Sequence, residues 1–153
     1  MTNYAKHWLD PNNDGNTSDG VDGFRLDHIY SNAPEGWGAP ITFWQNWCSA
    51  LRAVKPDVFI FGEPGDWGNY GTDLLTPTGF DAVLTKPWEF AARDAVLNES
   101  AAGLYNSTAS TVAAVPAGKL VVAQTSDHDS DRLASYWGSS NAKQKVGAAV
   151  LLT

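Results

Sequence analysis

Short apolar runs alternate with longer stretches of helical periodicity along most of this chain. Four of the runs are typical of strands, and they are Val21–Leu26, Val58–Phe61, Phe80–Leu84 and Leu120–Gln124. The second and fourth are almost continuously apolar, which is typical of strands buried on both faces of a parallel sheet. The pattern therefore predicts an α/β fold with a parallel sheet under helices.

Helical spacing is clearest between the first and second predicted strands, where apolar residues recur every three or four positions from Ile41 to Val54. Trp44, Trp47 and Cys48 should lie on the buried face of this helix. The same spacing predicts helices over Trp88–Leu97 and Ala142–Leu152. Two long loops, residues 10–20 and 64–79, remain, and long loops in compact domains are usually functional.

Composition and charge narrow the class of protein. With 153 residues, 43% hydrophobic and 18% charged, the chain has the size and apolar content of about one globular domain. Seventeen acidic against ten basic residues leave a net charge of −7, which disfavours nucleic acid and anionic membranes as partners. No membrane span or secretion signal is visible, and the single cysteine leaves the compartment open.

The first candidate site residue is Asp27, at the end of the first predicted strand. Residues two apart on a strand project to the same face, so Arg25 should lie beside Asp27. A neighbouring guanidinium keeps a carboxylate ionised, as a nucleophile requires. A purely structural ion pair is the alternative.

Two further acidic residues follow other predicted strands. Glu63 comes after an apolar run and shortly before Trp67, a setting that favours a protonated general acid, although a solvated glutamate is the alternative. Asp129 lies in an acidic segment after the fourth strand, where a merely hydrated loop is the alternative. Carboxyl ends of parallel barrel strands meet at one face, and glycoside hydrolysis needs two carboxyl groups there.

At these residues the sequence resembles glycoside hydrolase family 13, the α-amylase family. Three segments are similar to the family's motifs on barrel strands four, five and seven, and they are Gly23-Phe24-Arg25-Leu26-Asp27, Phe61-Gly62-Glu63 and Ser126-Asp127-His128-Asp129. The resemblance implies a partial (β/α)8 TIM barrel. It also implies an enzyme that cleaves or transfers α-glucosidic bonds in an α-glucan or oligosaccharide, without an organic cofactor.

The resemblance further implies a retaining double displacement. Asp27 would be the nucleophile and Glu63 the acid/base, while Asp129 and His128 would bind hydroxyls of the distorted sugar ring. Arg25 would orient the nucleophile.

Several positions depart from the family pattern or extend it. Residue 127 is Asp where the family usually has Asn or Ser, which adds negative charge beside Asp129. His28 follows the nucleophile where many members place a Lys-His pair shortly afterwards, and it either faces the cleft or serves packing. Trp67 and Trp37 lie in loops and are the predicted platforms for sugar rings.

The loop before the first strand has the oxygen-ligand spacing of a calcium site. Its candidate metal ligands are Asp10, Asn12, Asp14 and Asp19. The bidentate glutamate of an EF-hand is missing, because Val21 stands twelve positions into the loop. An Asx-rich turn without metal is the alternative to structural Ca²⁺.

The length suggests an incomplete barrel, since a closed one needs about 250 residues. Residues 1–153 are expected to form a partial catalytic domain, with strands one to three, strand eight and any C-terminal β-domain absent. Such a fragment would expose two sheet edges, self-associate and have little activity alone.

Two alternatives to an active glycosidase remain. One is a catalytically inactive relative that binds sugar or serves transport. The other is a barrel enzyme whose strand-end carboxylates hold magnesium, which Arg25 beside Asp27 disfavours because a cation there competes with the metal.

Overall fold

The computed structural model describes residues 1–29 and 39–152, which contain one four-stranded parallel sheet. Its strands are β1 (Gly23–Ile29), β2 (Phe59–Pro64), β3 (Ala82–Leu84) and β4 (Leu120–Val122). They are ordered β1-β2-β3-β4, so each strand pairs with the next one along the chain. The predicted α/β architecture with a parallel sheet is confirmed.

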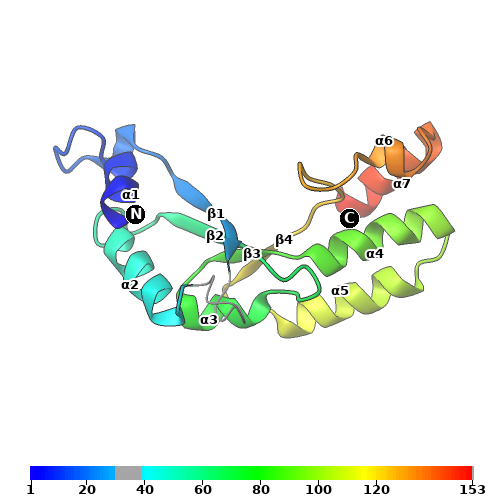
Figure 1. Cartoon of the computed structure of the whole chain (residues 1–153), viewed down its shortest axis with the longest axis horizontal. Coiled ribbons are helices and arrows are strands. Elements are labelled where there is room, and N and C mark those ends of the chain that lie inside the picture. The colour runs from blue at the N-terminus through cyan, green and yellow to red at the C-terminus, as the bar shows by residue number, and fades with distance from the viewer. Residues whose placement is uncertain (30–38, 153) are drawn as a thin grey trace.

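Helices flank this sheet on both sides of the view in Figure 1. The α-helices are α1 (Thr2–Leu9), α2 (Ile41–Arg52), α3 (Leu75–Thr78), α4 (Lys86–Asn98), α5 (Ala102–Ala114), α6 (Leu133–Tyr136) and α7 (Asn141–Leu152). Two short 3₁₀ helices are η1 (Thr17–Asp19) and η2 (Thr72–Leu74). Helices α1 and α2 lie at the left of the strands, and α4 to α7 lie at the right.

The sequence pattern predicted three of the α-helices and missed α1, α5 and the two single-turn helices α3 and α6. Helices α2, α4 and α7 confirm the three predicted ones to within two residues at each end. Helix α5 escaped prediction because its residues are mostly Ala, Ser and Thr, and only Ser107 and Thr111 are buried, so it has no apolar stripe. Helix α1 was missed as well, because it buries only Ala5 and Leu9.

The strand boundaries and the burial of β4 correct the sequence predictions. Strand β1 starts two residues later than predicted and continues to Ile29, so it includes Asp27. Strand β4 ends at Val122, two residues early, and the expectation that it is buried on both faces is wrong. Leu120 is 59% exposed because β4 stands at the edge of the sheet.

The main core lies between the sheet and helices α1 and α2. Trp47 and Leu51 of α2 belong to it together with Ile60 of β2 and Phe80, all almost fully buried. Burial of Trp44 and Cys48 on the same helix confirms their predicted place in the core. This packing anchors the first two strands, which carry Asp27 and Glu63.

The two ends of the sheet order, β1 and β4, pair with no further strand among residues 1–29 and 39–152. Self-association through these edges stays a prediction. Within the same residues, no helix combines the length and apolar character needed to cross a membrane.

Candidate active site

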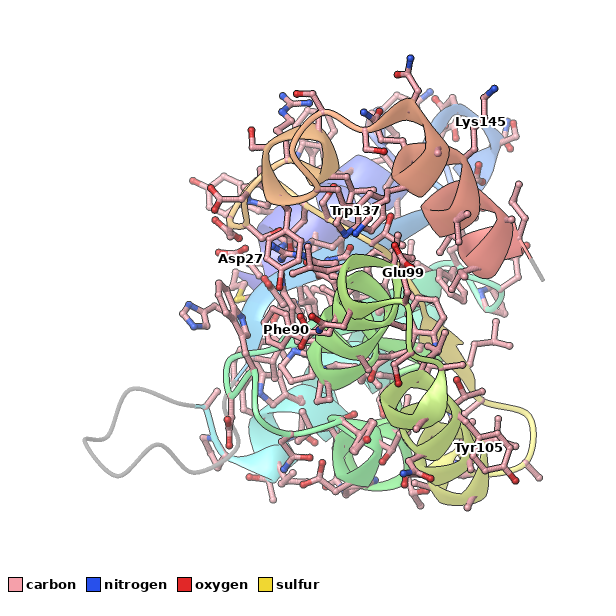
Figure 2. All side chains as sticks on the ribbon, turned by 90° about the vertical axis from the view of Figure 1, so that its right-hand side faces the viewer. Asp27, Phe90, Glu99, Tyr105, Trp137 and Lys145 are labelled. Carbon is pink, nitrogen blue, oxygen red and sulfur yellow. The ribbon has the colours of Figure 1, made fainter. Side chains whose placement is uncertain are left out.

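Six residues singled out in the sequence line one pocket of about 380 Å³ at the carboxyl ends of the strands. They are Asp27, His28, Glu63, Trp67, His128 and Asp129. The first three belong to β1 and β2, and the others to the loops that follow β2 and β4. The structure therefore brings together residues that are up to about a hundred positions apart, although their roles stay predictions. In Figure 2, Asp27 lies on the same side of the molecule as Phe90, whose ring neighbours Trp67.

Arg25 joins the two predicted reacting carboxyl groups. Its Nη1 donates to Asp27 Oδ1, and its Nη2 donates to Glu63 Oε2 at 2.6 Å. The side-by-side placement of Arg25 and Asp27 follows the prediction from strand periodicity, but the second contact was not foreseen. One guanidinium thus fixes a carboxyl group on each of two neighbouring strands.

An irregularity in β1 shapes the position of Asp27. Leu26 pairs with Gly62 and Ile29 pairs with Pro64, so β1 has one residue more than β2 between these pairs. This is a β-bulge, a feature that redirects side chains near functional sites. Within it His28 has φ +53°, a left-handed conformation that is uncommon for a residue with a side chain. The regular alternation assumed for the sequence did not predict this bulge.

Glu63 is the buried member of the site, with only 3% of its side chain exposed. Its Oε1 has no hydrogen-bond partner among the residues that the structure describes. The apolar run before Glu63 supplies only part of its surroundings, because Oε2 accepts from Arg25. Gly62 allows this packing, since a Cβ there would lie 3.1 Å from the Phe80 ring and 3.2 Å from Ile29.

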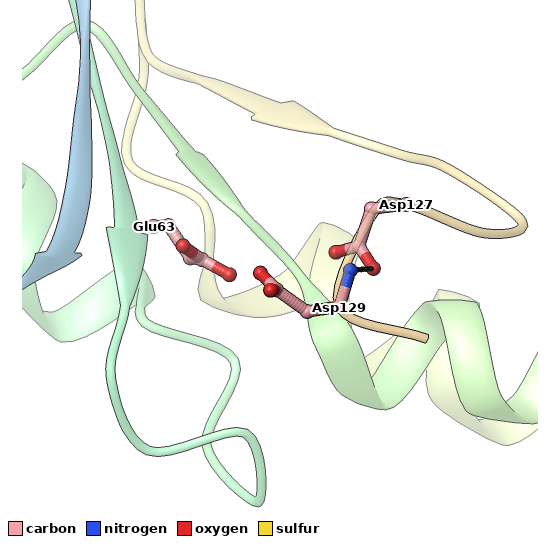
Figure 3. Close-up of side chains that lie close together, drawn as sticks. All are labelled: Glu63, Asp127 and Asp129. Carbon is pink, nitrogen blue, oxygen red and sulfur yellow. Dashed lines mark hydrogen bonds between the residues drawn. The ribbon is translucent and has the colours of Figure 1, made fainter. Parts of the chain in front are cut away.

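The loop after β4 brings Asp129 opposite Glu63 (Figure 3). One carboxylate oxygen each of Glu63, Asp127 and Asp129 lie within 4.8 Å of one another. His128 is 69% exposed, and its Nε2 lies 3.3 Å from Asp129 Oδ2. The pocket thus has two carboxyl groups facing each other and a histidine at its rim.

Asp127 is held differently from its neighbour Asp129. Burial acts to raise its pKa, but hydrogen bonds to the carboxylate from Lys86, Ser130 and Gln124, together with the charge of Lys86, outweigh it and lower the pKa to about 2. The negative charge that Asp127 adds beside Asp129 is thus paired with the Lys86 ammonium. The sequence analysis did not single out Lys86. The signal that was available is its position, as a charged residue at the start of an apolar helical stretch.

Trp67 lines the pocket, and its ring also contacts the side chains of Lys86 and Phe90. The Lys86 ammonium lies 4.4 Å from a Trp67 ring centroid, and the Phe90 ring packs 6.4 Å away. The Trp67 Nε1 is buried without a hydrogen-bond partner among the described residues. Trp37, the second predicted sugar platform, lies outside the described residues.

The predicted calcium loop is closed by hydrogen bonds of its own. Asp10 accepts from the backbone of Asp14 and Gly15 at 3.1 and 3.0 Å. The Asn12 Nδ2 donates to Asp14 and Asp19 at 3.1 and 3.0 Å, and so lies between two carboxylates. This arrangement gathers oxygen donors at an exposed turn, and calcium binding there stays a prediction.

Comparisons with known proteins concern the family and the fold of this chain. The sequence matches no protein-family model. It is 31% identical over 96 residues to an amylopullulanase of Thermoanaerobacterium saccharolyticum. The aligned segment covers 63% of this chain and 7% of that protein. It is 38% identical over 65 residues to Alpha-amylase 3 of Dictyoglomus thermophilum. This second aligned segment covers 40% of this chain and 11% of that protein.

Solved structures confirm the fold. The α-amylase from H. orenii matches 99% of this chain with a TM-score of 0.79 at 22% identity, and the match covers 30% of that chain. The cyclic α-maltosyl-(1→6)-maltose hydrolase from Arthrobacter globiformis, in complex with maltose, matches 98% with a TM-score of 0.74 at 20% identity, covering 31% of that chain. The four strands therefore form part of a TIM barrel. The relatives are α-amylase-family glycoside hydrolases, and the predicted resemblance to glycoside hydrolase family 13 is confirmed.

Proposed function

We propose that this chain carries the reacting groups of an α-glucan-active enzyme that cleaves or transfers α-glucosidic bonds with retention of configuration. The observation that carries the proposal is Glu63, a buried carboxyl group of the pocket lining whose one oxygen is held by Arg25 and whose other oxygen has no hydrogen-bond partner among residues 1–29 and 39–152. Buried polar atoms without partners are rare in folded proteins, so Oε1 is suited to meet a group of the substrate.

In the first step, an Asp27 oxygen attacks the anomeric carbon while the bond from that carbon to the glycosidic oxygen breaks. Glu63 donates its proton to the departing oxygen. The contacts suit this division of labour, because Arg25 donates to Oε2 of Glu63 and leaves Oε1 to carry the proton. The exposed carboxylate of Asp27 is open to the pocket for attack.

In the second step, water or a sugar hydroxyl attacks the same carbon, and the bond to Asp27 breaks. Glu63, now a carboxylate, accepts the proton of the attacking group. Asp129 faces Glu63 across the pocket and would bind ring hydroxyls, with His128 beside it. Transfer differs from hydrolysis only in the acceptor.

The shared guanidinium supports retention over inversion. Carboxyl groups lie about 5 to 5.5 Å apart in retaining enzymes and about 6.5 to 9.5 Å apart in inverting ones, where a water fits between them. Arg25 contacts both Asp27 and Glu63, which favours the shorter separation.

The relatives and the pocket support an α-glucan or oligosaccharide as the substrate class. An amylopullulanase and an α-amylase are similar in sequence, and one structural neighbour is a complex with maltose. A pocket of about 380 Å³ with carboxylates, a histidine and an indole offers both hydrogen bonds and an aromatic face to a sugar ring.

The test is Glu63→Gln in the longest natural polypeptide that contains residues 1–153, assayed on maltotriose and soluble starch. Loss of the general acid should lower kcat by about 10² to 10⁴-fold. Proton NMR of the first product should show the α-anomer from the unmodified protein. Unchanged cleavage in the variant, or a first product of β configuration, would refute the proposal.

Maltotriose binding and the response of activity to a chelator separate the two alternatives. A non-catalytic sugar-binding relative would bind maltotriose without cleaving it. A magnesium enzyme would lose activity in chelator and regain it with Mg²⁺. The carboxylates that lie closest together are those of Glu63, Asp127 and Asp129. Magnesium is disfavoured there, because Arg25 contacts Glu63 and Lys86 contacts Asp127, and these side-chain cations compete with a metal ion.

We also propose that the loop with Asp10, Asn12, Asp14 and Asp19 binds Ca²⁺ as a structural ion. A cation between the Asp14 and Asp19 carboxylates would displace the Asn12 amide nitrogen that lies there, and carboxylate oxygens are ligands that Ca²⁺ prefers.

A further inference from the structure

A buried network of charged side chains joins helix α4 to the loop after β4. Lys86 and Glu89 of α4 are 1% and 0% exposed. Lys86 Nζ contacts Asp127 Oδ2 and lies 3.4 Å from Glu89 Oε2. Glu89 also accepts from Gln124 at 2.7 Å and from Ser130 at 3.0 Å. Helix α4 therefore holds the loop at three of its positions.

This network reaches the pocket at two points without lining it. Asp127 Oδ1 accepts the backbone N–H of Asp129 at 3.1 Å (Figure 3). On the other side, the Lys86 ammonium lies over the Trp67 ring, 4.4 Å from its centroid. Lys86 thus contacts the pocket residue Trp67 directly and reaches Asp129, from a different loop, through Asp127.

The charges in the network balance. Lys86 and Arg93 carry two positive charges against the two negative charges of Glu89 and Asp127. Removing one member of a buried ion pair leaves an uncompensated charge, which costs far more than an exposed pair is worth. The unusual Asp127 is therefore matched by a buried lysine, where a neutral residue would need none.

We propose that Lys86 is a positioning residue for the sugar-binding pocket, holding Asp129 through Asp127 and the Trp67 ring directly. The proposal rests on the proposed glycosidase function. Lys86 does not line the pocket and is not a catalytic residue. Its effect depends on Asp127, so the two residues should behave as a coupled pair.

The test compares Lys86→Met, Asp127→Asn and the double variant in the longest natural polypeptide that contains residues 1–153. Lys86→Met should lower kcat on maltotriose by about 10- to 100-fold, because small displacements of a positioned group are costly, while KM changes less. The double variant should recover to within about tenfold of the unmodified protein, because an amide oxygen can accept the Asp129 N–H without leaving a buried charge.

The pH profile is the readout that a merely structural role would not move. Without Lys86, burial raises the pKa of Asp127, so the acid protonates and becomes neutral as the pH falls. The deficit of Lys86→Met should therefore be largest at high pH and shrink toward acid pH. The double variant should keep the profile of the unmodified protein.

Lys55→Met is the matched control. Lys55 is also buried, 7% exposed, and pairs with Asp22 at 2.8 Å, but it lies at the amino end of the sheet. This variant should keep its kcat. An unchanged kcat in Lys86→Met, or a folded double variant no more active than Lys86→Met, would overturn the proposal.

Two outcomes need a second criterion. If Lys86→Met does not fold, the double variant decides, and a folded double variant more than about 100-fold less active than the unmodified protein overturns the proposal. If Glu63→Gln leaves cleavage unchanged, the proposed function fails and the positioning role falls with it. Loss of cleavage in Glu63→Gln with full activity in Lys86→Met refutes the positioning role alone.

Discussion

At the carboxyl ends of β1 and β2, Arg25 contacts Asp27 and Glu63, whereas at the amino end of β3 Arg52 contacts Asp81. The two arginines are about equally exposed, at 33% and 30% of their side chains. Their carboxylate partners differ in how many of the carboxylate oxygens accept hydrogen bonds. Both Asp81 oxygens accept from Arg52 at 2.9 Å, and one also accepts the Ile60 N–H at 2.8 Å.

The carboxyl end leaves hydrogen-bonding capacity unused. Glu63 Oε1 has no partner among the described residues, and the carboxyl groups of Glu63 and Asp129 face each other in a pocket. Pockets of comparable size exist at both ends, about 380 and 300 Å³, so a cavity alone does not mark the site. The two ends differ in how fully their carboxylates are hydrogen-bonded, which fits a stabilising role for Asp81 and the proposed catalytic role for Glu63.

Replacing each arginine by methionine should separate the two ends most strongly. Arg25→Met should lower kcat by about 100-fold, because the two carboxyl groups lose their common support. Arg52→Met should keep kcat and lower the free energy of unfolding by about 1–3 kcal/mol, because it strips Asp81 of its charged partner. Starch hydrolysis and urea unfolding of both variants measure this. Equal effects of the two changes on kcat would erase the distinction.

The close packing at Gly62, next to Glu63, gives a second contrast between the site and the rest of the molecule. In Gly62→Ala the added Cβ meets Phe80 and Ile29 and should cost about 1–3 kcal/mol of stability and shift Glu63, with reduced kcat. Gly103→Ala in α5 is the control, since a Cβ there meets nothing within 4 Å and should stabilise the helix by about 0.5–1 kcal/mol. Urea unfolding with kcat in parallel tests the pair. A fully active Gly62→Ala would show that the tight contact does not position the acid.

The pH dependence of stability should report Asp127. Its pKa is about 2 in the folded protein and near 3.9 when unfolded, so the unfolded chain takes up the proton first as the pH falls. The contribution, about 2–3 kcal/mol, is complete above about pH 5 and is lost as the pH falls toward 2. Urea unfolding at pH 5, 4 and 3 should show this loss, with a shallower decline in Asp127→Asn. Parallel declines in both proteins would assign the acid sensitivity to other groups.

The smallest effect concerns the loop before β1. Calcium at ten times its dissociation constant should stabilise the protein by about 1.4 kcal/mol. Asp14→Ala should abolish the rise in melting temperature, while Asp57→Ala, an exposed residue outside the loop, should keep it. Isothermal titration with Ca²⁺ checks binding without any activity assay. A Ca²⁺ response that survives in Asp14→Ala would place the ion elsewhere.

Much of the fold and the membership of the pocket could be predicted from sequence, for physical reasons visible in particular residues. Apolar runs fixed the four strands, and the three-to-four spacing around Trp44 and Trp47 fixed α2, because burial imposes those periods. Asp27 and Glu63 were foreseen because parallel strands end at a common face. Helix α5 was not foreseen, because its contacts are hydrogen bonds such as that from Tyr70 to Ser107 rather than an apolar stripe.

The sequence by itself determined which residue types stand at the strand ends and in what order, since local periodicity and turn residues act within a few positions. Only the tertiary structure decided how those residues pair. The bulge at His28, the second contact of Arg25 and the link from Lys86 to Asp127 join residues from different elements. Such pairings depend on distances in space between chain segments, and no local pattern encodes them.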